Sequence, residues 1–255
     1  MDPRISDIED AALVAWPAAH VVDCDGWKLR FHWNMTGRAN SVWPNRLTGH
    51  RTVVERADAV ERFYHGKLQP ARYQICPISL PADLSRELDA RGYHRRSGAS
   101  VQIAPLTQLV REIDDPPGGG TKILSRPSDL WFAVQQDALA MDPASAGLRR
   151  SLIQGIEAKA GFAFTTMDEE PAAIGIGVIG GSWLGIFGMA TAHRFRRQGA
   201  AVRVLRALAR WGVENGAREA YLQVFEQNEP AVDLYRKLGF AELYVYHYRV
   251  EPWPD

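Results

Sequence analysis

The sequence predicts an α/β protein in which helices flank a mixed central sheet, arranged as two related halves. Strand-like and helix-like segments alternate along the 255 residues. Acids, two prolines and three glycines at 113–120 are typical of a linker between domains. In each half a helix closes on a glycine and an aromatic residue, at Gly92-Tyr93 and at Gly239-Phe240, and a strand follows. We therefore expect one fold repeated in tandem.

The first half, residues 1–112, is expected to form one domain. Strands are predicted at Trp27–Trp33, Arg72–Pro77 and Ser100–Pro105, with a further candidate at Ala39–Trp43, and helices at Thr52–Gly66 and Ala82–Arg91. A polar–aromatic set in the strand region suits either the wall of a ligand pocket or, as we favour, a packed seam against the other half. This set consists of Trp27, Arg30, Trp33, Arg38, Asn40, Trp43 and Asn45.

The second half, residues 121–255, is expected to form the other domain. Helices are predicted at Pro127–Ala140, with Ser128 or Asp129 as its cap, and at Leu148–Ala160. Strands are predicted at Phe162–Met167, Ala173–Ile179 and Trp183–Thr191, with a hairpin turn at Gly180-Gly181. The glycines within Ala173–Ile179 indicate a strand that another element approaches closely. A helix to about Glu214, a strand at Arg218–Phe225, a helix at Asn228–Leu238 and strands within Phe240–Val250 complete the order.

Composition and charge favour a reduced, cytoplasmic protein without nucleic-acid or membrane partners. Lys plus Arg and Asp plus Glu both total 30, so overall charge does not favour either partner. Cys24 and Cys76 form neither a disulfide framework nor a zinc motif. The acidic N-terminus is unlike a signal peptide, and no stretch approaches the ~18–20 apolar residues of a membrane helix.

The first candidate site is the turn from Arg196 to Ala201, which leaves a strand and opens a helix. The first N–H groups of a helix lack partners within the helix and bind phosphates readily. Gly199 allows the backbone to approach an anion, while Ala200 and Ala201 keep larger side chains away. Taken alone, a simple turn with arginines in solvent explains this pattern equally well.

The second candidate feature is the helix that begins after Asn228. Asn228 and Tyr235 are two helical turns apart, so they share one helix face and can offer an amide and a phenol to one extended ligand. The alternative is that Asn228 only caps the helix and Tyr235 only packs.

Together the two segments resemble the GNAT family of acetyl-CoA-dependent N-acetyltransferases, over about residues 122–250. The family's Arg/Gln-x-x-Gly-x-Gly/Ala turn is matched by Arg196, Gly199 and Ala201. Its Asn-x-x-Ala-x-x-Leu-Tyr-x-Lys-x-Gly-Phe segment is matched by Asn228, Ala231, Leu234, Tyr235, Lys237, Gly239 and Phe240. Two positions depart from the pattern, because Ala201 replaces the commoner glycine and His193 stands where many members have proline.

This resemblance implies the GNAT fold, acetyl-CoA as cosubstrate, no metal, and direct attack of an amine on the thioester in a ternary complex. The pyrophosphate would be held by Arg196, Arg197, Gln198, Gly199, Ala200 and Ala201, and the pantetheine arm by Met189, Ala190, Thr191 and Asn228. Tyr235 would bind the cofactor and act as general acid toward the departing thiolate.

The general base is not identified by these motifs. Many family members use a Glu on the strand before the phosphate turn, but Trp183–Thr191 contains no acid. Glu226, just after the next strand, is the favoured catalytic candidate, and His193, Tyr246 and His247 are alternatives. A water chain would also suffice for a surface amine. A basic stripe on the helix after the turn suits either the 3′-phosphate of coenzyme A or a solvated face, and consists of Arg203, Arg206 and Arg210.

The first half lacks both motifs, so it resembles a degenerate GNAT domain. We expect it to pack on the catalytic half and wall the acceptor pocket. The expected partners are acetyl-CoA and an amine, either a small molecule or a peptide, for a monomer or homodimer. The alternative function is a non-catalytic acyl-CoA-binding or regulatory module in which Tyr235 is structural.

Overall fold

The computed structural model describes residues 2–112 and 120–254. Its contacts divide the chain into two compact units. Unit 1 combines the residues up to Ser6 with Ala18–Ser100 and the chain from Tyr244 onward, and unit 2 combines Asp7–Pro17 with Val101–Leu243. This division differs from the expected linear one, because strands β5 (His94–Pro105) and β11 (Ala241–Val250) each contribute residues to both units. Of the expected linker at 113–120, only Gly120 lies within the described residues.

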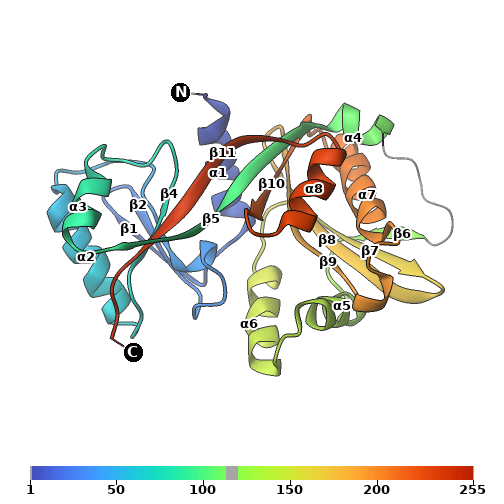
Figure 1. The fold of residues 1–255 in the computed structure, drawn as a ribbon, viewed down its shortest axis with the longest axis horizontal. Helices are drawn as coiled ribbons and strands as arrows, with labels where there is room; N and C mark the ends of the chain where they lie inside the picture. The colour runs from blue at the N-terminus through green and yellow to red at the C-terminus, as the bar shows by residue number, and fades with distance from the viewer. Residues whose placement is uncertain (1, 113–119, 255) are drawn as a thin grey trace. The chain divides into compact units, whose positions relative to one another are not determined.

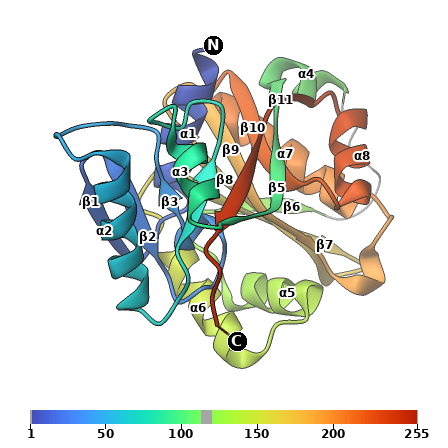
Figure 2. The ribbon, with the colours of Figure 1, turned by 60° about the vertical axis from the view of Figure 1, so that its left-hand side comes forward.

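Unit 1 is built on a small mixed sheet. Its strands β1 (His20–Cys24), β2 (Trp27–Phe31), β3 (Val42–Trp43) and β4 (Arg72–Ile75) are neighbours in that order, and β11 follows β4. β3 and β4 run parallel, and the other pairs run antiparallel. Helices α2 (Val53–His65) and α3 (Leu84–Ala90) pack together on these strands (Figures 1 and 2). Val60, Tyr64 and Leu88 of the two helices form a core with Trp27 and Tyr73.

Local polar contacts explain where the elements of unit 1 begin. The predicted helix at Thr52–Gly66 is confirmed as α2, and Thr52 caps it, since its hydroxyl accepts from the Glu55 N–H at 3.3 Å and Glu55 accepts from the Thr52 N–H at 2.8 Å. The predicted strand at Ala39–Trp43 is wrong in its first part, where Arg38–Asn40 forms a 3₁₀ turn. The cause is the Asn40 side chain, which accepts from the His32 N–H at 2.7 Å and donates to the Thr36 carbonyl at 2.8 Å.

Most of the polar–aromatic set lies in the interior of unit 1. Trp27, Arg30, Asn40, Trp43 and Asn45 are buried, whereas Trp33 is exposed. Arg30 donates to the Ser41 carbonyl at 3.1 Å and to Gln74 Oε1 at 3.0 Å. The set is thus largely a hydrogen-bonded core, and its roles as a pocket wall or a seam stay predictions.

Unit 2 contains a mixed sheet in the order β5, β10 (Glu219–Phe225), β9 (Trp183–Thr191), β8 (Glu170–Gly180), β7 (Ala160–Met167) and β6 (Thr121–Leu124). β9 and β10 run parallel, and β6 to β9 run antiparallel. Helices α5 (Asp129–Leu139) and α6 (Pro143–Gln154) lie on one side, and α7 (Ala200–Glu214) and α8 (Glu229–Lys237) on the other (Figures 1 and 2). Helices α1 (Arg4–Ala15) and α4 (Leu106–Glu112) were not predicted from the sequence, and neither were strands β1 of unit 1 and β6 of unit 2.

The element that approaches the glycines of β8 is α7. A Cβ atom added at Gly175 would lie 2.7 Å from Val204 Cγ1, and one at Gly177 would lie 3.1 Å from Leu208 Cδ2. These two positions exclude larger side chains because α7 packs directly on the strand. The packing fixes the height of α7 above the sheet, and thus the place of its N-terminal turn.

The two helices on the other side begin at side-chain caps. Ser128 accepts from the Trp131 N–H at 3.2 Å, so it, rather than Asp129, caps α5. The predicted helix at Leu148–Ala160 is wrong at both ends, since α6 begins at Pro143 and ends at Gln154. Its cap is Asp142, whose Oδ1 accepts from the N–H groups of residues 144 and 145, and proline is favoured at the first helical position.

None of the helices in the described residues combines the length and apolar character that spanning a bilayer requires.

Candidate active site

The centre of the candidate site is a β-bulge in β9. Ile174 and Ile176 of β8, two residues apart, pair with Ala190 and Phe187 of β9, which are three residues apart. Gly188 lies in the extra step with a φ of +57°, a conformation that glycine adopts without strain. The bulge turns Phe187 and Gly188 toward the side of the sheet that carries α5, because Phe187 stacks on Trp16 and a Cβ at Gly188 would contact Gln135.

Beyond the bulge, β9 leaves its parallel neighbour. The pairing of β9 with β10 ends at Ile186 and Leu222, although β9 continues to Thr191 and β10 to Phe225. Within the described strand registers, residues 189–191 therefore have a partner on the β8 side alone. Their other edge presents backbone groups that an extended ligand can pair with, as a further strand would.

The turn before α7 has the geometry of an anion site. Arg197 and Gly199 have φ values of +62° and +82°, and α7 begins at Ala200. The first bond of the helix runs from the Arg203 N–H to the Gly199 carbonyl, at 3.1 Å. The N–H groups of the first helical turn point out of the helix start, where the helix dipole favours negative charge. The structure thus gathers the predicted phosphate residues into one compact turn.

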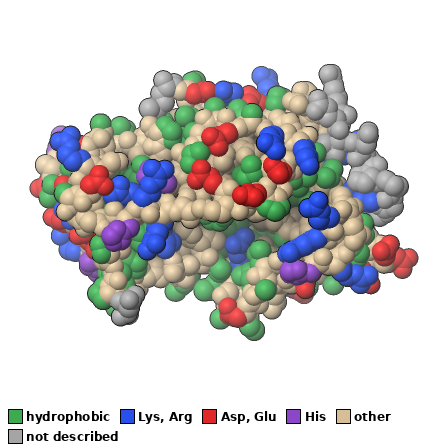
Figure 3. All heavy atoms as spheres, in the orientation of Figure 1, with side chains coloured by type: hydrophobic (Ala, Val, Ile, Leu, Met, Phe, Trp, Pro, Cys, Tyr) green, Lys and Arg blue, Asp and Glu red, His purple; other side chains and the backbone are tan. Residues whose placement is uncertain are grey.

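Side-chain contacts hold this turn in place. Gln198 donates to the Arg194 carbonyl at 2.8 Å, and Arg194 forms an ion pair with Glu170 on β8. Arg196 donates to the Ala138 carbonyl at 3.3 Å, which ties the turn to the end of α5. Basic side chains gather on the visible face over the region between α8 and α5 (Figure 3). Positive charge and free N–H groups therefore meet at one end of the open edge of β9.

Tyr235 lies on α8 and is 8% exposed. Its ring meets Phe240 edge to face, with 5.8 Å between centroids, and the helix closes behind it through the Phe240 N–H, which donates to the Tyr235 carbonyl at 3.0 Å. Gly239, with a φ of +89°, permits this closure as predicted. Burial raises the pKa of Tyr235 to about 12, so the phenol is protonated at neutral pH and is able to donate a hydrogen bond.

Asn228 occupies the N-cap position of α8, but its side chain does not cap the helix, so the alternative in which Asn228 only caps is wrong. The side chain makes no cap hydrogen bond, and the residue has φ −86° and ψ 61°, outside the extended region typical of caps. Instead, the Ala231 N–H donates to the backbone carbonyl of Asn228 at 3.0 Å. The exposed amide of Asn228 is therefore not used in capping.

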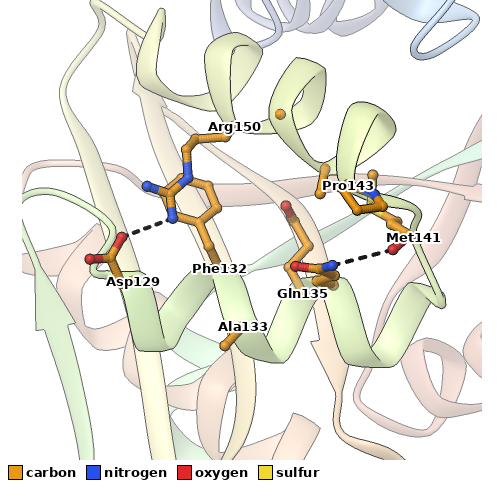
Figure 4. A pocket seen from close by; sticks show the side chains of 10 residues that line it. Asp129, Phe132, Ala133, Gln135, Met141, Pro143 and Arg150 are labelled. Carbon is orange, nitrogen blue, oxygen red and sulfur yellow. Dashed lines mark hydrogen bonds and ion pairs between the residues drawn. The ribbon is translucent and has the colours of Figure 1, made fainter.

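A pocket of about 330 Å³ lies between α5 and α6 (Figure 4). Arg150 crosses it, with an ion pair to Asp129 at 2.8 Å and a cation–π contact at 4.2 Å from the Phe132 ring centroid. Gln136 donates to the Met141 carbonyl at 3.4 Å. The other lining residues are Ala133, Gln135, Pro143, Ala146 and Gly147. The sequence analysis did not predict this pocket. Asp142-Pro143 could have indicated the start of α6, and with it one wall of the pocket.

The base candidates are scattered. Glu226 is exposed in the turn between β10 and α8. His193 lies beside the phosphate turn, where its backbone N–H is 3.4 Å from Asp137 Oδ2. Tyr246 and His247 belong to unit 1, where β11 pairs with β4, and burial lowers the pKa of His247. Among residues 2–112 and 120–254, no group of three or more His, Cys, Asp or Glu side chains is arranged to hold a metal ion.

Comparisons with known proteins match nearly the whole chain. A family model described as "Probable histone acetyltransferase Rv0428c C-terminal" matches residues 3–249. The chain is 28% identical over 249 residues to the uncharacterized N-acetyltransferase YobR of Bacillus subtilis (strain 168), which covers 97% of this chain and 98% of that protein. A solved GCN5-related N-acetyltransferase from Kribbella flavida superposes with a TM-score of 0.72 at 18% identity, over 97% of this chain and 95% of that one. A tandem GNAT protein from the clavulanic acid biosynthesis pathway gives a TM-score of 0.64 at 15% identity, over 81% and 72% of the two chains.

Proposed function

Because this chain belongs to the family described as "Probable histone acetyltransferase Rv0428c C-terminal", and so to the GNAT acyltransferases, we propose that it transfers the acetyl group of acetyl-CoA to an amine by direct attack in a ternary complex. The observation that carries this proposal is the open edge of β9 at residues 189–191, which leads to the positive-φ turn before α7. An extended, strand-like arm that leads to a phosphate group fits this arrangement, and the pantetheine arm and pyrophosphate of coenzyme A have that form.

In this proposal, the pyrophosphate accepts hydrogen bonds from the N–H groups between Arg197 and Ala201. The pantetheine arm pairs with the backbone of Met189, Ala190 and Thr191, and the exposed amide of Asn228 provides a further hydrogen bond. The absence of a capping bond at Asn228 supports this role, because the amide is not engaged at the helix start. The acetyl group then lies beside the bulge at Gly188, between β9 and the end of β10.

The acceptor amine binds in the pocket between α5 and α6. This pocket shares Gln135 with the surroundings of the bulge, so a bound amine is within reach of an acetyl group placed there. Apolar groups of Phe132, Met141 and Pro143 suit the carbon skeleton of an amine. The Asp129–Arg150 pair lies at the rim, where the Asp129 side chain is 92% exposed, and offers both signs of charge to polar substituents.

The neutral amine attacks the thioester carbonyl carbon, so the C–N bond forms and the C–S bond breaks. The amine gives up its proton to Glu226 or to water, and the sulfur leaves as thiolate and then takes up a proton. Since burial places the pKa of Tyr235 near 12, above the ~8.5 of a free thiol, Tyr235 acts chiefly by donating a hydrogen bond to the developing thiolate. The products are an N-acetyl amide and coenzyme A.

The test is release of the coenzyme A thiol with a panel of amines. We expect release with at least one amine, a kcat roughly ten- to hundredfold lower in Tyr235→Phe, and unchanged coenzyme A affinity by calorimetry. Tyr73→Phe is the matched control, since Tyr73 is also a buried tyrosine and belongs to unit 1. Binding of coenzyme A without thiol release under any condition would identify a non-catalytic acyl-CoA-binding module instead.

A further inference from the structure

Gln135 is a buried polar residue whose amide nitrogen makes no hydrogen bond within the described part of the chain. It lies on α5 and is 3% exposed, and its Nε2 has no hydrogen-bond partner in the described part of the chain. Buried amide groups in folded proteins are nearly always paired, because an unpaired donor forfeits its hydrogen bonds to water. The next residue, Gln136, shows the ordinary solution, since it is exposed and donates to the Met141 carbonyl.

The surroundings of Gln135 place its amide between two parts of the site. It lines the pocket between α5 and α6 (Figure 4). A Cβ atom built at Gly188 would lie 4.0 Å from Nε2 and 3.2 Å from Ile176 Cδ1. Because residue 188 is glycine, no side chain stands between the amide and the backbone of the bulge. A donor thus faces the junction of the pocket and the bulge.

We propose that Gln135 binds an oxygen atom of the acceptor, and that the enzyme selects amines that carry a carbonyl oxygen beside the reacting nitrogen, as α-amino amides and peptide N-termini do. This inference rests on the proposed function. The amine lone pair is consumed in the attack on the thioester, so it is not available to accept from Nε2. A carbonyl oxygen on the same molecule is the acceptor that we assign to this buried donor.

The chemistry of the pocket agrees with such a ligand. Phe132 and Met141 provide an apolar wall for an aliphatic or aromatic substituent, and Gln135 is the buried polar group on the α5 side. A site built around one hydrogen-bond donor rejects analogues that lack the matching acceptor, because the donor is then left unpaired. Discrimination between an amine with the oxygen and one without it is thus the property that Gln135 sets.

The experiment compares matched amines, alaninamide with ethylamine and leucinamide with isopentylamine, by thiol release. The wild type is expected to prefer the amide of each pair. Gln135→Met keeps the volume and removes the donor, and it should lower kcat/KM for the amides roughly ten- to hundredfold while leaving the alkylamines within about twofold. Each ratio is compared with the same ratio in the wild type, so differences in amine basicity cancel.

The control is Gln154→Met, an exposed residue at the end of α6 outside the pocket, for which both ratios should be unchanged. Gln135→Leu serves as a second variant if the Met variant unfolds, with folding checked by circular dichroism. An unchanged amide-to-alkylamine ratio in a folded Gln135 variant overturns the proposal, and so does a loss of coenzyme A affinity equal to the loss of rate. A wild type inactive with every amine overturns the proposed function itself, and that failure is seen before any variant is made.

Discussion

Replacement of Gly199 by alanine tests the proposed cofactor role of the turn separately from its backbone strain. Gly199 has φ +82° and directly precedes α7, where an L-residue costs roughly 1–2 kcal/mol. We expect a fall in Tm of roughly 2–8 °C, as for a unit of this size. The added methyl group also enters the space where the pyrophosphate approaches the backbone, so coenzyme A affinity should fall more than about tenfold, or more than ~1.4 kcal/mol.

The matched control is Gly181→Ala in the β8–β9 turn. Gly181 has φ +60°, and a Cβ atom there meets nothing within 4 Å, so the variant carries the strain without approaching the proposed site. Calorimetry gives the coenzyme A affinity, and acetyl-pantetheine, which lacks the pyrophosphate, tests the position of the loss. Equal coenzyme A affinity in the two variants would refute the reasoning, as would an equal loss for acetyl-pantetheine.

Three other predictions follow from individual contacts. Tyr235 has a folded-state pKa near 12 against 10.0 for the free group, so the wild type should lose about 2–3 kcal/mol of stability between pH 10 and 12 that Tyr235→Phe retains, as measured by denaturant unfolding. Below pH 10 the difference in stability between the two proteins should not change with pH, and a difference that changes with pH there would contradict the assignment. Residues 121–255 alone should fail to fold. Trp16 is 1% exposed and stacks on Phe187 at 5.6 Å, and its loss alone should lower the free energy of unfolding by about 3–5 kcal/mol. A soluble and fully active fragment would disprove this. Asp142→Ala removes the N-cap of α6, so it should lower the free energy of unfolding by about 0.5–2 kcal/mol and raise KM for the amine more than KM for acetyl-CoA. Equal changes in both KM values would argue against an acceptor pocket at α6.

The elements predicted best from the sequence are those with a turn or a helix cap at their ends. The strand at Trp183–Thr191 was predicted at its observed bounds, since a Gly-Gly turn precedes it and its apolar run is unbroken. α5 was predicted with Ser128 as one of its two candidate caps, and the Ser128 hydroxyl does accept from the first helical turn. The start of α6 was missed because Asp142-Pro143 was not weighed as a cap followed by a first-turn proline. Helix caps and turns in the local sequence were therefore enough to predict element boundaries where they were taken into account.

Features set by contacts distant in sequence could not be predicted in this way. β5 and β11 serve both units, which depends on pairings between segments more than a hundred residues apart. The glycine of the β9 bulge is one of several in β8 and β9, and the conformation of Gly188 depends on how β8 pairs. Gln135 becomes a candidate because α5 and the sheet bury it, while Gln136, next to it in sequence, stays exposed.

A crystal structure of the complex with coenzyme A tests the central claim most directly. We predict that the pyrophosphate accepts hydrogen bonds from the backbone N–H groups between Arg197 and Ala201, and that the pantetheine arm pairs with residues 189–191 of β9. The sulfur should lie beside Gly188, within hydrogen-bond reach of the Tyr235 hydroxyl. Coenzyme A bound elsewhere, or a pantetheine arm that leaves the edge of β9 unpaired, would contradict the proposed site.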